Sequence, residues 1–236
     1  MSEILHISQI HKRFGKNHVL RGLDLSLDRG KVHGLLGKNG EGKTTLIRII
    51  MGVIPADAGT IQVNGRAIRY SDASYKTDIG YIPEDPFFYE NLKIGEFLAY
   101  NALFYPSWDA RKAGAYLDRF SLNPKAPISA LSRGMKLKLG FVTALSANPS
   151  LLILDDPTSG LDVPTRQDFL KDIIRELADG GTTVLFSTHL VHELERIVDR
   201  VHILKAGRIV VSDDYEHLKT QTGQAGLEAI FMAYVA

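Results

Sequence analysis

Hydrophobic and polar positions alternate in several short segments of the first third of the chain. ILHISQI and VLRGLDLSL each show the alternation of a half-buried strand, and GTIQVNGRAI shows it around Asn64-Gly65, a dipeptide typical of hairpin turns. Before that hairpin, VHGLLG reads as a short buried strand, and TTLIRIIMGV carries apolar residues at helical spacing. We therefore expect this third to consist mainly of strands, with one helix.

The pattern changes between Pro86 and about Asn148. IGEFLAYNALFY, DARKAGAYLDRF and MKLKLGFVTALSA have helical spacing, and the strand-like alternation disappears. After this block, LLILD, TTVLFST and RVHILKAGRIVVSD predict strands again, and PTRQDFLKDIIRELADG predicts a helix. Strands and helices that flank a helical block predict an α/β fold, in which a parallel-sheet core carries a helical insertion.

Composition narrows the class of protein. The chain has 236 residues, 28 Lys plus Arg against 27 Asp plus Glu, a net charge of +1 and no cysteine. The balanced charge favours no nucleic-acid partner, and the lack of cysteine excludes disulfides and cysteine-bound zinc. The opening residues MSEILHISQI do not resemble a signal peptide, and no apolar stretch approaches about 20 residues. These features predict a soluble, cytoplasmic protein.

Residues 37–44, GKNGEGKT, match the pattern G-x-x-x-x-G-K-[ST] between a predicted strand and a predicted helix. The glycines allow several backbone N–H groups to point into one anion-sized hollow, and the following helix adds its dipole. Lys43 is expected to meet the β and γ phosphates, and the Thr44 hydroxyl to hold Mg²⁺. The candidate nucleotide-binding residues of this loop are Gly37, Lys38, Asn39, Gly40, Glu41, Gly42, Lys43, Thr44 and Thr45.

Two carboxylates, Asp155 and Asp156, follow the apolar run in LLILDDPTSGLD. Neighbouring side chains of an extended strand point to opposite faces, so we expect the two to have different roles. Asp155 suits a residue that engages Mg²⁺ across from Thr44, directly or through water. Asp156 could act as a base or position the attacking water. The alternative is that one or both cap the turn before Pro157.

LSRGMKLKL at 131–139, LLILDDPTSGLD and STHL at 187–190 occur in an order and spacing that resemble the ATP-binding cassette (ABC) ATPases over nearly the whole chain. The resemblance implies a P-loop NTPase fold of the ABC ATPase type. Such a fold has a RecA-like core, an N-terminal antiparallel β subdomain and an inserted α-helical subdomain. On this chain it predicts a single nucleotide-binding domain, with residues 1–85 and 149–236 as the core and 86–148 as the helical signature subdomain.

The resemblance also implies roles for individual residues. GKNGEGKTT resembles Walker A, LLILD resembles Walker B, and Asp156 occupies the place usually held by the catalytic glutamate. SGLD, with Asp162, resembles the D-loop, and His189 matches the switch histidine. Phe14 matches the aromatic residue that stacks on adenine. The alternatives are a structural role for His189 after its strand, and simple core packing for Phe14.

The signature stretch LSRGM departs from the usual LSGGQ, because Arg133 replaces a glycine and Met135 replaces the glutamine, while Ser132 and Gly134 remain. At the start of a helix these residues would aim a hydroxyl, N–H groups and the helix dipole at a phosphate. In the family this loop meets the nucleotide of the opposite subunit, which implies a homodimer, or a heterodimer with a second ABC ATPase. The alternative is an ordinary serine cap.

Glu84, in DIGYIPEDPFFYE, lies where many members carry the glutamine of the Q-loop, and its carboxylate can reach Mg²⁺ or water. Phe87, Phe88 and Tyr89 follow directly. In transporters of the family the surface next to this loop receives a short helix of the membrane subunit. The alternative for the three aromatic residues is packing within the helical lobe.

The resemblance implies an ATP-hydrolysing subunit, with ATP and Mg²⁺ as cofactors and a membrane-embedded permease as partner. The subunit would lie peripherally on the inner face of the cell membrane. Glu84, FYPSWD at 104–109 and LSRGMK resemble the ATPase subunits of bacterial ABC-2-type exporters. Hydrolysis is expected to be slow, because Asp156 is shorter than glutamate. The rival functions are a soluble ABC protein without a permease and a regulatory module that barely hydrolyses ATP.

Overall fold

The computed structural model describes residues 3–178, 181–224 and 226–235. The chain forms two compact units, residues 1–75 with 180–236, and residues 76–179. Both contain helices and strands, and the architecture is mixed α/β, as the sequence predicts. Among the described helices, none is both long and apolar enough to cross a membrane. The predicted division at residues 86 and 148 remains a prediction.

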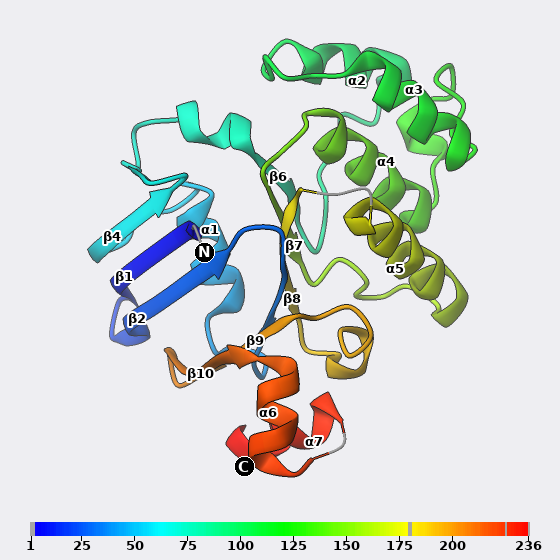
Figure 1. Ribbon diagram of the computed structural model, residues 1–236. Helices are drawn as coiled ribbons and strands as arrows, with labels where there is room; N and C mark the ends of the chain where they lie inside the picture. The colour runs from blue at the N-terminus through cyan, green and yellow to red at the C-terminus, as the bar shows by residue number, and fades with distance from the viewer. Residues whose placement is uncertain (1–2, 179–180, 225, 236) are drawn as a thin grey trace. The chain divides into compact units, whose positions relative to one another are not determined.

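The first unit contains an antiparallel sheet with the strand order β2-β1-β4-β5. In Figure 1, β1 and β2 lie side by side in blue, with β4 next to β1. The strands are β1 (Glu3–Phe14), β2 (Asn17–Asp28), β4 (Ala58–Val63) and β5 (Arg66–Ala67). Asn64 and Gly65 both have positive φ, 53° and 73°, as the two-residue hairpin between β4 and β5 requires.

The same unit contains a largely parallel group of strands, which leads into the phosphate loop. β3 (Val32–Leu36) pairs in parallel with β8 (Thr183–Thr188) and β9 (Arg200–Lys205), and β9 pairs antiparallel with β10 (Arg208–Asp214). Every residue of β3 and of β8 is buried, which explains their continuous apolar runs. The helices of this unit are α1 (Lys43–Ile50), the short η3 (Val191–Glu193), α6 (Tyr215–Thr222) and α7 (Leu227–Val235).

Two buried histidines join β3 to β9. His33 Nε2 donates to the Asp28 carbonyl oxygen at 3.0 Å, so His33 Nδ1 is left to accept from His202 Nε2 at 3.0 Å. His202 Nδ1 then accepts from the Ser212 hydroxyl at 2.9 Å. Burial lowers the pKa of His33, and burial with the neighbouring His33 lowers that of His202 well below its usual value. Both rings are therefore neutral near pH 7.

In the second unit a pair of parallel strands is accompanied by the predicted helical block. β6 (Ile79–Ile82) pairs with β7 (Leu151–Asp155), and α2, α3 and α4 are the green helices of Figure 1. Asp109 caps α3 by accepting from the Arg111 and Lys112 N–H groups. The helices are η1 (Ser74–Asp78, at the boundary of the units), α2 (Ile94–Ala102), α3 (Ala110–Arg119), η2 (Ile128–Ala130), α4 (Arg133–Ser146) and α5 (Val163–Ala178).

Segments predicted as helices or strands are confirmed within the described residues. The end of PTRQDFLKDIIRELADG, residues 179 and 180, lies outside them. Within the described residues, the sequence did not predict β6, α6 and α7, nor the short helices η1, η2 and η3. The four-residue strand β6 is too short to show a period, and α7 is apolar on several sides.

Candidate functional site

The glycine-rich loop lies between the buried strand β3 and helix α1, as the phosphate-binding pattern requires. Gly40 and Gly42 have φ of 85° and 110°, which side-chain-bearing residues rarely adopt. A Cβ on Gly42 would also lie 2.8 Å from Leu20 Cδ2. The chain therefore turns sharply into α1 only because glycine stands at these positions.

Lys43, the first residue of α1, is 7% exposed, and its ammonium group lies within the loop. Its Nζ atom donates to the carbonyl oxygens of Gly37 at 2.6 Å and Lys38 at 3.3 Å. A cation is thus placed beside the first turn of a helix, whose unpaired N–H groups favour anions. Thr44 and Thr45 follow in the same turn and are half-buried, while Asn39 is exposed. This arrangement suits a phosphate group.

Two other side chains of the loop, Lys38 and Glu41, form hydrogen bonds with segments outside the loop. Lys38 Nζ donates to the Val235 carbonyl oxygen at 3.0 Å, and a Glu41 carboxylate oxygen accepts from the Ala206 N–H group. Both partners come from the C-terminal part of the chain, and nothing in the sequence pattern indicated them. The two contacts hold the loop on both sides of Asn39 and Gly40.

Phe14 ends β1, and its side chain is 51% exposed rather than packed in the core. Lys12 Nζ lies 5.4 Å from the centre of its ring and is held by Asp57 at 2.9 Å. An exposed ring with one cation beside it remains available for stacking on a base. His189 is also exposed, directly after β8, where the Leu190 N–H group donates to Thr188 Oγ1 at 2.9 Å.

In the second unit, Asp155 ends β7 and is 2% exposed, and Asp156 is 8% exposed. Asp156 has φ of 47°, the left-handed region, which Asp and Asn adopt more readily than most residues. Its carbonyl oxygen accepts from the Ser159 N–H group at 3.1 Å, so Asp156 opens a tight turn. Asp156 thus combines a turn position with a buried carboxylate.

The signature residues form the start of α4. Ser132 Oγ accepts from the Met135 N–H group at 3.3 Å, which is a serine cap. A Cβ on Gly134 would lie 2.9 Å from Thr165 Cγ2, so α4 approaches the first turn of α5 closely there. The guanidinium of Arg133 lies against Gly160, where an added Cβ would be 2.5 Å from Nη1. Arg133 therefore fills space beside the loop that follows Asp156.

Asp162 precedes α5 and caps it. Its two carboxylate oxygens accept from the Thr165 N–H group at 2.9 Å and from Thr165 Oγ1 at 2.8 Å. The hydrogen bond from the Thr165 N–H group lowers the pKa of Asp162 below its usual value. Its carboxylate is therefore ionised at neutral pH, and both of its oxygens are hydrogen-bonded to Thr165 of the same chain.

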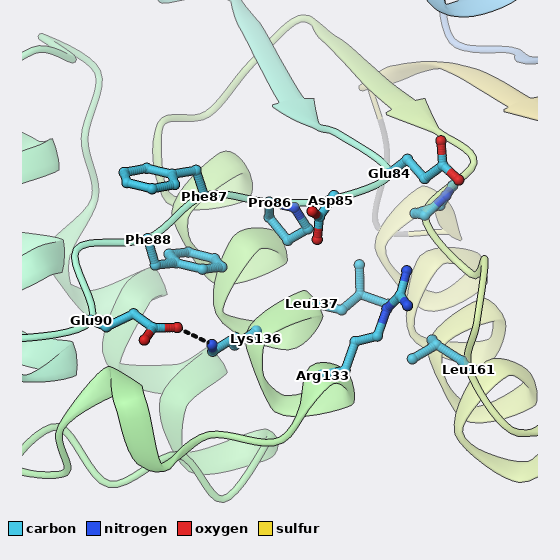
Figure 2. A pocket seen from close by; sticks show the side chains of 11 residues that line it. Glu84, Asp85, Pro86, Phe87, Phe88, Glu90, Arg133, Lys136, Leu137 and Leu161 are labelled. Atoms are coloured by element: carbon cyan, nitrogen blue, oxygen red, sulfur yellow. Dashed lines mark hydrogen bonds and ion pairs between the residues drawn. The ribbon is translucent and has the colours of Figure 1, made fainter.

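A pocket of about 370 Å³ adjoins the signature helix within this unit, and Glu84 lies at its edge (Figure 2). Lys136 Nζ and Glu90 form an ion pair of 2.5 Å on one side, and Phe87 is 85% exposed. The pocket is lined by Glu84, Asp85, Pro86, Phe87, Phe88, Glu90, Arg133, Lys136, Leu137, Pro157 and Leu161. The pocket therefore combines charged side chains with apolar ones such as Phe88 and Leu137.

The candidate residues thus fall into two sets. Phe14, the glycine-rich loop and His189 belong to the first unit, and Glu84, Asp155, Asp156, the signature residues and Asp162 belong to the second. Among the described side chains, no group of three or more His, Asp or Glu is arranged to hold a metal ion. Mg²⁺ commonly takes only one or two protein oxygens together with phosphate oxygens, so Thr44 and Asp155 retain the right chemistry.

Residues 20–159 match the family model described as "ABC transporter". The chain is 32% identical over 218 residues to the ABC transporter ATP-binding protein YtrB of Bacillus subtilis (strain 168), covering 92% of this chain and 74% of that protein. It is 36% identical over 226 residues to the Nod factor export ATP-binding protein I of Ralstonia nicotianae, covering 92% and 69%. A solved ATP-binding subunit of an ABC transporter superposes with a TM-score of 0.87 at 30% identity, covering 98% of both chains.

Proposed function

This chain belongs to the ABC transporter family as an ATP-binding and ATP-hydrolysing subunit, and from that premise we propose that it drives export by a separate membrane-embedded permease. Support for export comes from one similar protein, the Nod factor export ATP-binding protein I. The exporter-like stretches at Glu84, 104–109 and 131–136 also favour it. The subunit would lie peripherally on the cytoplasmic face of the membrane.

The observation that carries the nucleotide assignment is the position of Lys43 beside two left-handed glycines at the start of α1. ATP would place its phosphates on the N–H groups of this loop, with Lys43 at the β and γ phosphates. Thr44 and Asp155 would hold Mg²⁺, which neutralises charge on the phosphates, and Glu84 would reach the metal or its water. The exposed ring of Phe14 would stack on the adenine.

Asp156 is proposed as the residue that positions or deprotonates the attacking water, assisted by His189. Its buried carboxylate supports this role. Aspartate is shorter than glutamate by one methylene, about 1.5 Å from a single C–C bond. Misplacement by about 1 Å can lower a rate on the order of a hundredfold, so we expect slow hydrolysis in the isolated subunit.

The signature loop is proposed to act on the nucleotide of a second ATPase subunit, with Asp162 at the junction. Ser132 and the first N–H groups of α4 offer a cap that a phosphate can share, and Arg133 adds a cation that the usual glycine lacks. The proposed assembly is a head-to-tail dimer, either of two copies of this chain or with a second ABC ATPase. The segment 86–148 would act as its helical lobe.

The permease is proposed to contact the pocket at the start of α4. Phe87 and Tyr89 are 85% and 53% exposed, and their rings are 6.0 Å apart, which supports a docking surface. Phe88 also lines the pocket, but it is buried, and its ring packs against Phe97 with the ring centres 5.3 Å apart. Under this proposal Phe87 and Tyr89 belong to the docking surface, and Phe88 mainly packs within the helical lobe.

Light scattering with Mg·ATP tests the assignment. The Asp156→Asn variant, in which hydrolysis is blocked, is expected to be a monomer without nucleotide and to double its mass when Mg·ATP is added. A matched Asp156→Asn, Ser132→Arg double variant should stay monomeric, because the bulky side chain fills the phosphate face of the signature loop. No mass change at high protein concentration in the first variant would contradict the dimer, and no nucleotide binding would contradict the site.

A further inference from the structure

The last turn of the C-terminal helix α7 is held by two lysines. Lys38 Nζ donates to the Val235 carbonyl oxygen and Lys205 Nζ to the Tyr234 carbonyl oxygen, each at 3.0 Å. The last carbonyl groups of a helix have no partner within the helix and carry the negative end of its dipole. Two of these carbonyl groups therefore accept from ammonium groups, one of which belongs to the phosphate loop.

A second contact fixes the other side of the loop. Glu41 accepts from the Ala206 N–H group, and Ala206 directly follows Lys205 at the tight turn between β9 and β10. Ala206, with φ of 49°, lies in this turn outside the pairing of β9 with β10, and its N–H group donates to Glu41 instead. One short segment, Lys205-Ala206, thus contacts both the end of α7 and the phosphate loop.

The helices α6 and α7 also contact the segment that follows His189. α7 packs against η3, and Tyr215 of α6 donates its hydroxyl to Glu195 Oε1 at 3.1 Å. Leu194, Leu227 and Ile230 are fully buried, so buried apolar side chains contribute to this contact. Helices α6 and α7 therefore pack against the segment that follows His189, and α7 is also hydrogen-bonded to the phosphate loop through Lys38.

We propose that Lys38 and Lys205 are positioning residues for nucleotide binding, through which α7 holds the phosphate loop in its binding shape. The inference rests on the proposed nucleotide site. A loop that is already ordered loses less conformational freedom when phosphate binds, so anchors at Lys38 and Glu41 raise affinity. Linkage makes the effect reciprocal, because nucleotide binding then stabilises α7 by the same factor.

Lys205→Met is the discriminating variant, since Lys205 lies outside the loop, whereas Lys38 can also meet a phosphate directly. Calorimetric titration with Mg·ADP, which is not consumed, should show affinity weakened by roughly threefold to tenfold, the effect of one charge-assisted hydrogen bond acting at a distance. Lys205→Arg should restore affinity to within about twofold. Lys171→Met, which removes an exposed lysine paired with Asp168, is the matched control and should bind as the parent does.

Hydrogen exchange gives a second measurement, which would show no effect of Lys205→Met if Lys205 had only a structural role. Mg·ADP should slow amide exchange in residues 227–235 of the parent, and this slowing should disappear in Lys205→Met. The parent measurement decides the matter even if the variant does not fold. Parent-like affinity in a folded Lys205→Met, or exchange at 227–235 that is indifferent to nucleotide, would overturn this inference alone. Absence of any nucleotide binding by the parent would overturn the proposed function with it.

Discussion

The phosphate loop and the signature loop differ in how their side chains are held. In the first, Lys43, Lys38 and Glu41 all bond to backbone groups of the chain itself. In the second, Ser132 makes one capping contact of 3.3 Å, and the Arg133 side chain has no hydrogen bond or ion pair within the part of the chain that the structure describes. The loop proposed to bind nucleotide is thus held by its own chain, whereas the signature loop has fewer such contacts, as we would expect if a second subunit completes it.

The largest expected effect lies in the phosphate loop. Lys43→Ala should weaken ATP binding by a factor of about a hundred or more, because it removes a phosphate-facing charge from a buried position. Calorimetry measures the loss, and Lys171→Ala, at an exposed site on α5, serves as the control. Unchanged affinity in Lys43→Ala would mean that this loop is not the nucleotide site.

Asp156 provides the next test, on turnover rather than binding. Asp156→Asn should lower the steady-state ATPase rate on the order of a hundredfold and leave ATP affinity intact, because the water loses its partner. Asp155→Asn should instead weaken Mg²⁺-dependent binding, since charge is lost beside the metal. If Asp156→Asn hydrolyses ATP at the parent's rate, Asp156 is only a turn residue, and His189 becomes the first candidate for positioning the water.

Asp156→Glu sharpens the same test. If reach limits the reaction, this variant should raise the maximal rate with little change in ATP affinity. The backbone opposes it, because φ of 47° suits aspartate better than glutamate, and we expect a loss of about 1 kcal/mol of unfolding free energy. A stability measurement beside the rate separates the two effects. A rate that does not rise in the folded variant would show that reach is not limiting.

Acid should weaken the first unit selectively. His33 and His202 have pKa values lowered by burial, so the unfolded chain binds protons that the folded chain does not. Stability is full above the unfolded pKa of about 6.5. It falls as pH drops below that value, by at most about 1.4 kcal/mol per pH unit for each histidine, until the pH reaches the lowered folded pKa. Nearby Arg200 and Lys31 also lower the pKa of His33, while the Asp28 carboxylate raises it.

Thermal unfolding between pH 8 and pH 5.5 measures this dependence. Replacing His202 by Gln should flatten it, and His192→Gln, at an exposed site in η3, should not. Hydrogen exchange should show β3 and β9 loosening before α4. A parent whose unfolding free energy is the same at pH 8 and pH 5.5 would contradict the assignment of two neutral rings.

The smallest effect is expected at the signature loop. Arg133→Gly should change the unfolding free energy by no more than about 0.5 kcal/mol and leave ATP affinity of the monomer within about twofold, because its guanidinium only fills space beside Gly160. The ATP-dependent dimer should respond more, since a cation is removed from the proposed phosphate contact. A large loss of monomer stability would instead make Arg133 part of the fold.

The sequence predicted features that depend on near neighbours. The phosphate loop was found because glycine and lysine spacing is local, and the Asn64-Gly65 hairpin because positive φ needs those residues. Contacts of Lys38 with Val235 and of Glu41 with Ala206 join residues 197 and 165 positions apart, and no local pattern records such pairs. The left-handed backbone conformation of Asp156 was likewise not predicted, because aspartate is common in many kinds of turn.

The histidine pair has a consequence for spectroscopy. Since the Asp28 carbonyl can only accept, both rings must carry their proton on Nε2, and both Nδ1 atoms must keep a lone pair. Two of the eight imidazoles in the chain should therefore give ring N–H signals that exchange slowly with water. Within each of these rings, the protonated Nε2 and the unprotonated Nδ1 should have different nitrogen chemical shifts. Because His33 stands four residues before Gly37, NMR measurement of these signals can be used to follow structural changes in the phosphate loop.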